Sequence, residues 1–181
     1  MINDWSYFIE RSIWQIPDAF IDNIWMICIW ALTNIFYFLK KRRRNGENRH
    51  FFAILFAESL FFIVYHSFLN RPFHNTCEYN LIPFWSYRTN DYRGLNLIIQ
   101  NILNVFLYIP YGVFLCGMLK HPTIKNVLSI GLLTSASVEL IQLVLHCGFC
   151  ETDDVIHNCI GVTIGFVAFK CMKRLYKYLK K

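Results

Sequence analysis

The sequence predicts an all-α integral membrane protein with five transmembrane helices, and two observations support this fold class. First, 55% of its 181 residues are hydrophobic and only 17% are charged, against roughly 25% charged residues in an ordinary soluble domain. Second, apolar stretches alternate with short basic blocks, and about 20 apolar residues in a helix span a bilayer core. We therefore expect a multi-pass protein of the cell membrane, in contact with membrane lipids.

The net charge of +6 does not predict a nucleic-acid partner. Its basic residues sit in blocks beside apolar segments, where they act as topology signals at an anionic membrane surface. No RNA-binding or zinc-finger spacing accompanies the charge.

Residues 1–50 form the first expected unit. Met1–Ile21 carries aromatic residues among polar ones, which favours a short helix lying at the membrane interface. Phe20–Leu39 is the first expected span, and the basic loop that begins at Lys40 is expected in the cytoplasm.

Residues 51–181 form the second expected unit, a four-helix membrane domain with a basic C-terminal tail. A polar, irregular segment, Asn70–Arg93, separates its first two helices. The expected spans are Phe51–Leu69, Leu95–Leu119, Val127–His146 and Asp154–Met172.

The distribution of basic residues predicts the orientation. If the loop after the first span is inside, 14 of the 18 lysines and arginines lie in inside segments. Outside lie Arg11, Arg71, Arg88 and Arg93. Since cytoplasmic loops are enriched in lysine and arginine, the N-terminus is expected outside and the C-terminus inside.

Polar side chains converge in the outer halves of the last three spans. Residues three or four apart share a helix face, so each span contributes a pair. The pairs are Asn101 with Asn104, Glu139 with Gln142, and Asp154 with Asn158. Polar groups at membrane depth must face a partner or a watery cavity, which predicts an outward-facing polar pocket.

Each polar group also has a structural interpretation. The amides of Asn101, Asn104 and Gln142 can hydrogen-bond between helices, and Glu139 can be a neutral, hydrogen-bonded residue. Asp153 can cap the last helix, where the macrodipole favours an acid. We expect Glu151 at the rim of the pocket, His157 at the interface, and Gly161 with Gly165 in close helix packing, since small residues four apart let helices approach closely.

Cysteine usage predicts no metal or cofactor. Cys147 and Cys150 form a CxxC, but no second CxxC or Cys/His pair completes a zinc site. A disulfide between Cys77 and either Cys147 or Cys150 is an alternative that the sequence does not decide, for the case of an oxidising compartment.

Four sequence motifs in this order resemble the VanZ-like family over about Phe51 to Met172. They are Asn80-Leu-Ile-Pro-Phe84, Asn101-Ile-Leu-Asn104 with Ile109-Pro-Tyr-Gly112, Glu139-Leu-Ile-Gln142, and Asp153-Asp-Val-Ile-His-Asn158 with Gly161. Within these motifs, Asn80, Pro83 and Phe84 join Asn101, Asn104, Gln142, Asp153 and Asn158 as predicted ligand-binding residues.

The resemblance implies a bacterial cell-envelope membrane protein related to one that gives low-level resistance to the glycopeptide teicoplanin. It does not supply a biochemical mechanism. This chain reads Glu151-Thr-Asp-Asp154 where many relatives have Asp-x-Asp-Asp, and it lacks an arginine often found shortly before those acids. The span Phe20–Leu39 resembles an addition outside the family core.

Three functions fit these observations. The first is binding of an amphipathic ligand, either a lipid-linked wall intermediate or the lipoglycopeptide, in the outward pocket. The second is an enzyme acting on a lipid headgroup, with Glu139 or Asp154 as general acid or base. The third is a scaffold in an envelope complex, in which the polar residues only hold helices together. Whether the protein is an enzyme stays open at this point.

Overall fold

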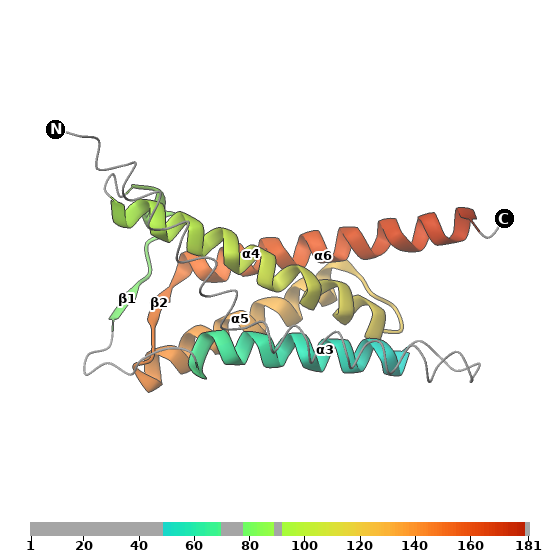
Figure 1. Cartoon of the computed structure of the whole chain (residues 1–181), viewed down its shortest axis with the longest axis horizontal. Coiled ribbons are helices and arrows are strands. Elements are labelled where there is room, and N and C mark those ends of the chain that lie inside the picture. Colours follow the sequence, from blue (N-terminus) through green and yellow to red (C-terminus); the bar gives the residue numbers. More distant parts are fainter. Residues whose placement is uncertain (1–48, 70–77, 89–91, 180–181) are drawn as a thin grey trace.

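The computed structural model describes residues 49–69, 78–88 and 92–179 of the chain. The expected interfacial segment, the first span Phe20–Leu39 and Cys77 lie outside these residues. The described part is a bundle of four long helices with two short strands at one end (Figure 1). The helices are α3 (Arg49–Val64), α4 (Tyr92–Met118), α5 (Ile124–Leu145) and α6 (Thr152–Leu179).

All four helices are long and apolar enough to cross a membrane, which confirms the four spans predicted within these residues. α3 qualifies together with the π-helical turn η1 (Tyr65–Leu69) that continues it. Large apolar side chains such as Phe106, Leu133 and Val144 point outward from the bundle. An apolar exterior around a packed interior is what a lipid environment requires.

The helices end at other residues than the predicted spans where the helical backbone continues beyond the apolar segment. α6 begins at Thr152 and continues beyond Met172 through exposed, lysine-rich turns to Leu179. Figure 1 shows this last part extending past the other helices. α5 begins after Thr123, whose side chain accepts a hydrogen bond from the Asn126 amide (3.2 Å), and ends at His146 in a left-handed conformation.

Close packing of α4 against α6 forms the centre of the bundle. A Cβ added at Gly112 would lie 2.6 Å from the Val162 carbonyl oxygen. A Cβ at Gly161 or Gly165 would meet the Val105 or Ile109 carbonyl oxygen of α4. The predicted close helix packing at Gly161 and Gly165 is therefore confirmed.

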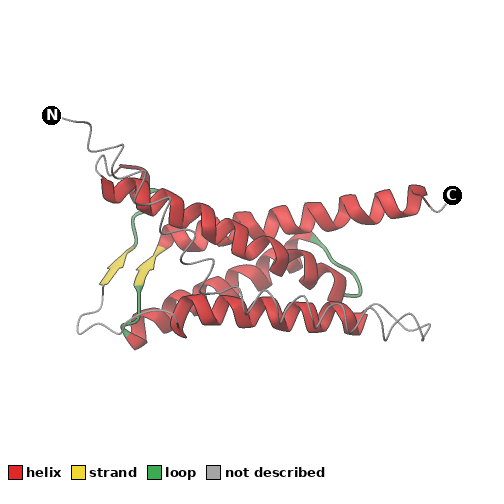
Figure 2. Ribbon diagram, viewed as in Figure 1, coloured by secondary structure: helices red, strands yellow, loops and turns green. Residues whose placement is uncertain are grey.

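A two-stranded parallel sheet closes one end of the bundle, which we call the strand end (Figure 2). β1 (Glu78–Asn80) pairs with β2 (Phe149–Glu151), with Asn80 opposite Glu151. The segment Asn70–Arg93 was expected to be irregular, and β1 and the 3₁₀ turn η2 (Trp85–Arg88) correct that prediction. α4 and α6 begin at the strand end, and α3 and α5 end there.

Basic side chains hold the opposite end, which we call the basic end. Arg49 Nε donates to the carbonyl oxygen of Met118 at the end of α4 (3.0 Å). Lys170 Nζ donates to the carbonyl oxygen of Pro122 (3.1 Å), in the turn that joins α4 to α5. These contacts satisfy carbonyl groups that a helix end or turn leaves without a backbone donor.

Candidate functional site

One face of α5 brings polar side chains into the interior near the strand end. Ser135, Glu139 and Gln142 are three or four residues apart and are all buried, with Glu139 5% and Gln142 1% exposed. Glu139 Oε2 accepts a hydrogen bond from the backbone amide of Glu151 in β2 (3.0 Å). Gln142 Nε2 donates to the carbonyl oxygen of Ser67 at the end of the first described span (3.1 Å).

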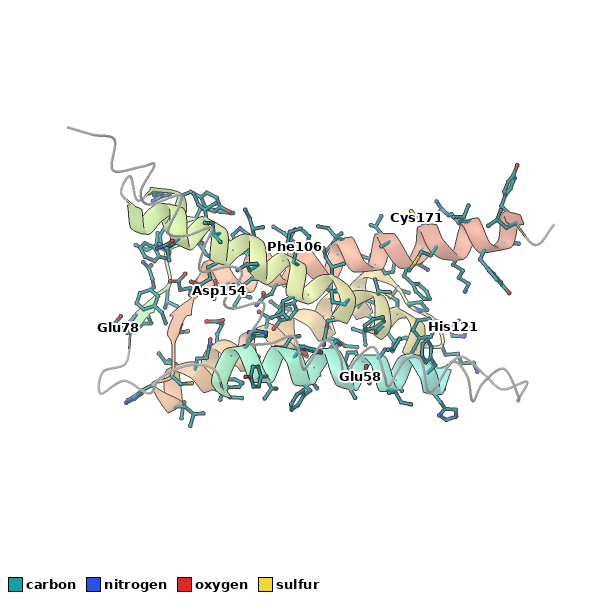
Figure 3. All side chains as sticks on the ribbon, in the orientation of Figure 1. Glu58, Glu78, Phe106, His121, Asp154 and Cys171 are labelled. Carbon is teal, nitrogen blue, oxygen red and sulfur yellow. The ribbon has the colours of Figure 1, made fainter. Side chains whose placement is uncertain are left out.

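α6 places two predicted residues against that face. Asn158 Nδ2 donates to Ser135 Oγ (2.8 Å), which joins α6 to α5. Asp154, one turn earlier, is buried (3% exposed), and Figure 3 shows it near the start of α6 where α4 crosses. Tyr108 of α4 is buried in the neighbourhood of Glu139 and Asp154.

Three helices therefore share one group of buried side chains, which we call the polar cluster. Its members are Tyr108, Ser135, Glu139, Asp154 and Asn158.

Asp153 has a second function in the fold that the sequence analysis underestimated. It is fully buried and accepts hydrogen bonds from the Phe84 amide, the Ser86 amide (3.1 Å) and Ser86 Oγ (2.5 Å). Asn101 Nδ2 in turn donates to Ser86 Oγ (2.9 Å). Asp153 is thus more than a helix cap, because it ties the loop before α4 to the start of α6. We call Asp153, Ser86 and Asn101 the loop clamp.

His157 is buried beside the loop clamp, and its expected position at the membrane interface stays a prediction. Its Nδ1 lies 2.6 Å from the Asp153 carbonyl oxygen, and its Nε2 lies 2.7 Å from the Tyr87 hydroxyl. A carbonyl oxygen only accepts hydrogen bonds, so Nδ1 carries the proton and, in the neutral ring, Nε2 accepts from Tyr87. The Tyr87 and His157 rings also stack, with centroids 5.8 Å apart.

Three of the predicted ligand-binding residues, Asn80, Pro83 and Phe84, lie at the end of β1 and in the loop that follows it. Asn80 Oδ1 accepts a hydrogen bond from the Ile82 amide (3.0 Å), which folds the chain into an Asx turn. Pro83 and Phe84 are exposed, and Phe84 adopts a left-handed backbone conformation (φ 59°). These three residues shape the loop that the clamp holds.

The two amides of α4 have different surroundings. Asn101 is buried and belongs to the loop clamp. Asn104 is half-buried, and its Nδ2 has no hydrogen-bond partner among the described residues. Asn101 thus makes the kind of structural hydrogen bond that was one of its two predicted roles. Asn104 Nδ2 is a donor without an acceptor among the described residues.

Several residues of the site escaped the sequence analysis. Glu151, expected at the rim, is buried (4% exposed), and its backbone amide donates to Glu139 Oε2. Ser135 lies one helical turn before Glu139 on the same face of α5. Tyr108 lies one turn after Asn104 on the same face of α4. This spacing is a sequence signal from which both residues could have been predicted. Ser86 and Tyr87 carry no such signal, since they lie in a loop.

The cysteine and metal predictions concern the same end of the bundle. Within the described ranges, Cys147 is a buried free thiol, and no three His, Cys, Asp or Glu side chains are grouped so that they could hold a metal ion. A bond to Cys77 stays a prediction.

Comparison with known proteins adds the family. A search of curated proteins and a search of solved structures each gave no match. A family model described as VanZ/LLP1 matches residues 23–173, which extends N-terminally beyond the resemblance found from the motifs. Because this match covers most of the 181 residues and overlaps all four described spans, the chain belongs to the VanZ/LLP1 family of multi-pass membrane proteins.

Proposed function

We propose that the protein binds an amphipathic or lipid-linked ligand in an outward-facing polar site at the strand end, and that this binding alters sensitivity to teicoplanin-type glycopeptides. The observation that carries the proposal is the burial of Glu139, Asp154 and Asn158 together between α5 and α6. A carboxylate inside a membrane span costs about 2.5 to 3.5 kcal/mol on insertion scales, so residues kept there are functional by default.

The proposed orientation follows from the two ends of the bundle. The basic end contains Arg49, Lys120, Lys125 and Lys170, and the basic C-terminal part of α6 extends beyond it. Lysine and arginine concentrate on the cytoplasmic side of membrane proteins. The strand end then faces outside. With the expected first span, Phe20–Leu39, which lies outside the described residues, the orientation agrees with the N-terminus expected outside from the sequence.

The chemical class of the ligand is proposed from the depth of the site in the membrane and from the family to which the chain belongs. A site at the outer end of a bundle with apolar sides lies where a lipid headgroup meets its acyl chains. Both a lipid-linked wall intermediate and the acyl-bearing antibiotic have this amphipathic form. The family link to teicoplanin resistance supports an effect on glycopeptide sensitivity.

Site substitutions in the full chain test this proposal. Glu139→Gln, Asp154→Asn and Asn158→Ala are expressed in a teicoplanin-sensitive strain in which the unaltered protein raises the minimal inhibitory concentration. Each variant is expected to lower that concentration toward the value of the empty-vector strain, because the first two replace a buried carboxyl group of the site by an amide and the third removes a buried amide. Glu78→Gln and Asn126→Ala, at exposed positions, make the same chemical changes away from the cluster and are expected to keep full resistance.

Membrane abundance and thermal stability of each variant are measured alongside. If all three site variants are as abundant and stable as the unaltered protein and keep full resistance, the proposal is wrong. If cells with the unaltered protein contain a modified lipid that cells with Glu139→Gln lack, the protein is an enzyme that acts on a lipid and the binding proposal is replaced. If a partner protein co-purifies with the unaltered protein, and the variants lose it only to the extent that they lose stability, the protein is a scaffold.

A further inference from the structure

We infer that the loop from Leu81 to Tyr87 lies in the membrane interface at the strand end, and that its apolar side chains contact lipid. We call residues 81–87 the interfacial loop. The interfacial loop contains no member of the polar cluster, so its partner does not depend on the proposed function. Four observations support the assignment: the exposed side chains of the loop, its fixed backbone, its level along the bundle, and the apolar exterior of the helices at that level.

The interfacial loop begins with four consecutive apolar residues, and all four are exposed. Leu81 is 64%, Ile82 56% and Phe84 50% exposed, and Pro83 lies between them. Such a run of exposed apolar side chains marks a surface that contacts another molecule or a membrane. Tyr87, whose ring centroid lies 6.3 Å from that of Phe84, is of a residue type enriched where a membrane meets water.

Hydrogen bonds on both sides of this run fix its backbone. Asn80 Oδ1 accepts from the Ile82 amide (3.0 Å), and the Asp153 carboxylate accepts from the amides of Phe84 and Ser86. Phe84 is held in the left-handed conformation (φ 59°), which a large side chain adopts only where its surroundings fix it. The apolar side chains therefore cannot turn inward without breaking these contacts.

Contacts with α4 and α6 give the level of the interfacial loop along the bundle. Ser86 Oγ accepts from Asn101 Nδ2 (2.9 Å), and the Tyr87 hydroxyl contacts His157 Nε2 (2.7 Å). Asn101 and His157 each lie five residues after the first residue of their candidate span. At about 1.5 Å per residue, both contacts lie about 7.5 Å inside the ends of the spans. Interfacial segments lie about 5 to 10 Å into the boundary between headgroups and acyl chains.

The sheet gives a similar level from α5. Asn80, which precedes the interfacial loop, pairs with Glu151, and the Glu151 amide donates to Glu139 Oε2 (3.0 Å). Glu139 lies six residues before Leu145, the last residue of α5, which is about 9 Å from that end of the helix. Three spanning helices therefore hold the loop and its base at the ends of the spans rather than beyond them.

The surface of the bundle at this level is apolar. Ile102 and Leu103, which directly follow Asn101 on α4, are exposed, and so are Val144 and Leu145 in the last turn of α5. In a membrane protein, these side chains face lipid. The exposed side chains of the interfacial loop lie at the same level, so the lipid that surrounds the helices is the partner that fits them.

Fluorescence of a dye on single cysteines tests where the loop lies. Leu81→Cys and Ile82→Cys are made in a cysteine-free background of the full chain, labelled with the environment-sensitive dye NBD, and reconstituted in phosphatidylcholine nanodiscs. The quenchers are iodide in the water, a lipid with a nitroxide near the headgroup end of its acyl chain, and a lipid with a nitroxide near the methyl end. Glu78→Cys, which Figure 3 shows at the far edge of the strand end, is the control for water. Leu133→Cys, exposed near the middle of α5, is the control for the membrane centre.

The labelled loop is expected to emit at a shorter wavelength than the Glu78→Cys control and to be quenched less by iodide, because the dye leaves water. Its quenching is expected to be strongest with the nitroxide near the headgroup end. Leu133→Cys is expected to be quenched most by the nitroxide near the methyl end. Both loop positions are exposed, and thermal unfolding of each labelled variant checks that the fold is kept.

Three results would overturn the assignment. Iodide quenching as strong as in Glu78→Cys, without quenching by either nitroxide, would place the loop in water. Protection from iodide and from both nitroxides would show that protein covers the loop, either residues 1–48 of the same chain or a second copy. Quenching that matches Leu133→Cys would place the loop in the membrane centre and not in the interface.

Discussion

Asp153 connects three backbone and side-chain donors of the loop to the first turn of α6. Asp153→Asn replaces one acceptor oxygen by an NH₂ group, which then faces either the Phe84 amide or the two Ser86 donors. Unsatisfied buried groups cost about 1 to 3 kcal/mol each, so this variant is expected to unfold at a lower temperature than the unaltered protein. Ser86→Ala removes one donor and is expected to have a smaller effect.

Thermal unfolding of purified protein in detergent measures this order, with Glu78→Gln as the matched control. Trypsin provides a local readout, because Arg88 is exposed beside the clamped loop. Faster cleavage after Arg88 is expected in Asp153→Asn. An unfolding temperature equal to that of the unaltered protein would show that the loop clamp does not stabilise the fold.

The surroundings of a residue could be predicted from the sequence when the residue lies in an apolar helix, and not when its contacts are made by a loop. Glu139, Gln142 and Asn158 were predicted to face inward from their spacing on apolar helices, and all three are buried. The contacts of Asp153 depend on the path of a loop some seventy residues earlier in the chain, which no periodicity encodes. For the same reason Ser86 could not be found from sequence.

At the scale of elements, the crossing of α4 and α6 depends on glycine. An added methyl group at Gly161 would meet the backbone of α4 at Val105, which cannot move without shifting the whole helix. At Gly131 the methyl group would meet only the side chain of Val162, 2.8 Å away, which can adjust. Overpacking costs about 1 to 3 kcal/mol, so Gly161→Ala is expected to destabilise the protein more than Gly131→Ala.

The comparison is made by thermal unfolding of both variants in the same detergent. Each change also raises intrinsic helix propensity by the same amount, so the difference between the variants isolates packing. Equal unfolding temperatures for the two variants would contradict the proposed close approach of α4 and α6.

Elements were predictable in proportion to their length and apolar content. α5 was predicted within three residues at each end, because an apolar segment is bounded by the turn around Pro122 and by His146. β1 and β2 are three residues each and pair across about seventy residues of chain. Such short strands are fixed by their neighbours, here by the Glu139 contact to Glu151, and their sequence carries no signal of the pairing.

At the scale of the whole molecule, the bundle has two chemically different ends. One end has the short sheet, the loop clamp and the buried acids, and the other has the basic turns and the exposed end of α6. The basic blocks predicted this division from sequence alone, since hydropathy and charge act over whole segments. The side on which each end lies still depends on the positive-inside rule.

The central claim is that the polar cluster serves the outer face of the membrane, and cysteine labelling in intact cells tests it most directly. In a cysteine-free background, Glu78→Cys places a thiol at the strand end and Lys120→Cys places one at the basic end, both at exposed positions. We predict that a membrane-impermeant maleimide labels Glu78→Cys in intact cells and Lys120→Cys only after permeabilisation. Labelling of Lys120→Cys in intact cells, with Glu78→Cys protected until permeabilisation, would place the site inside and contradict the claim.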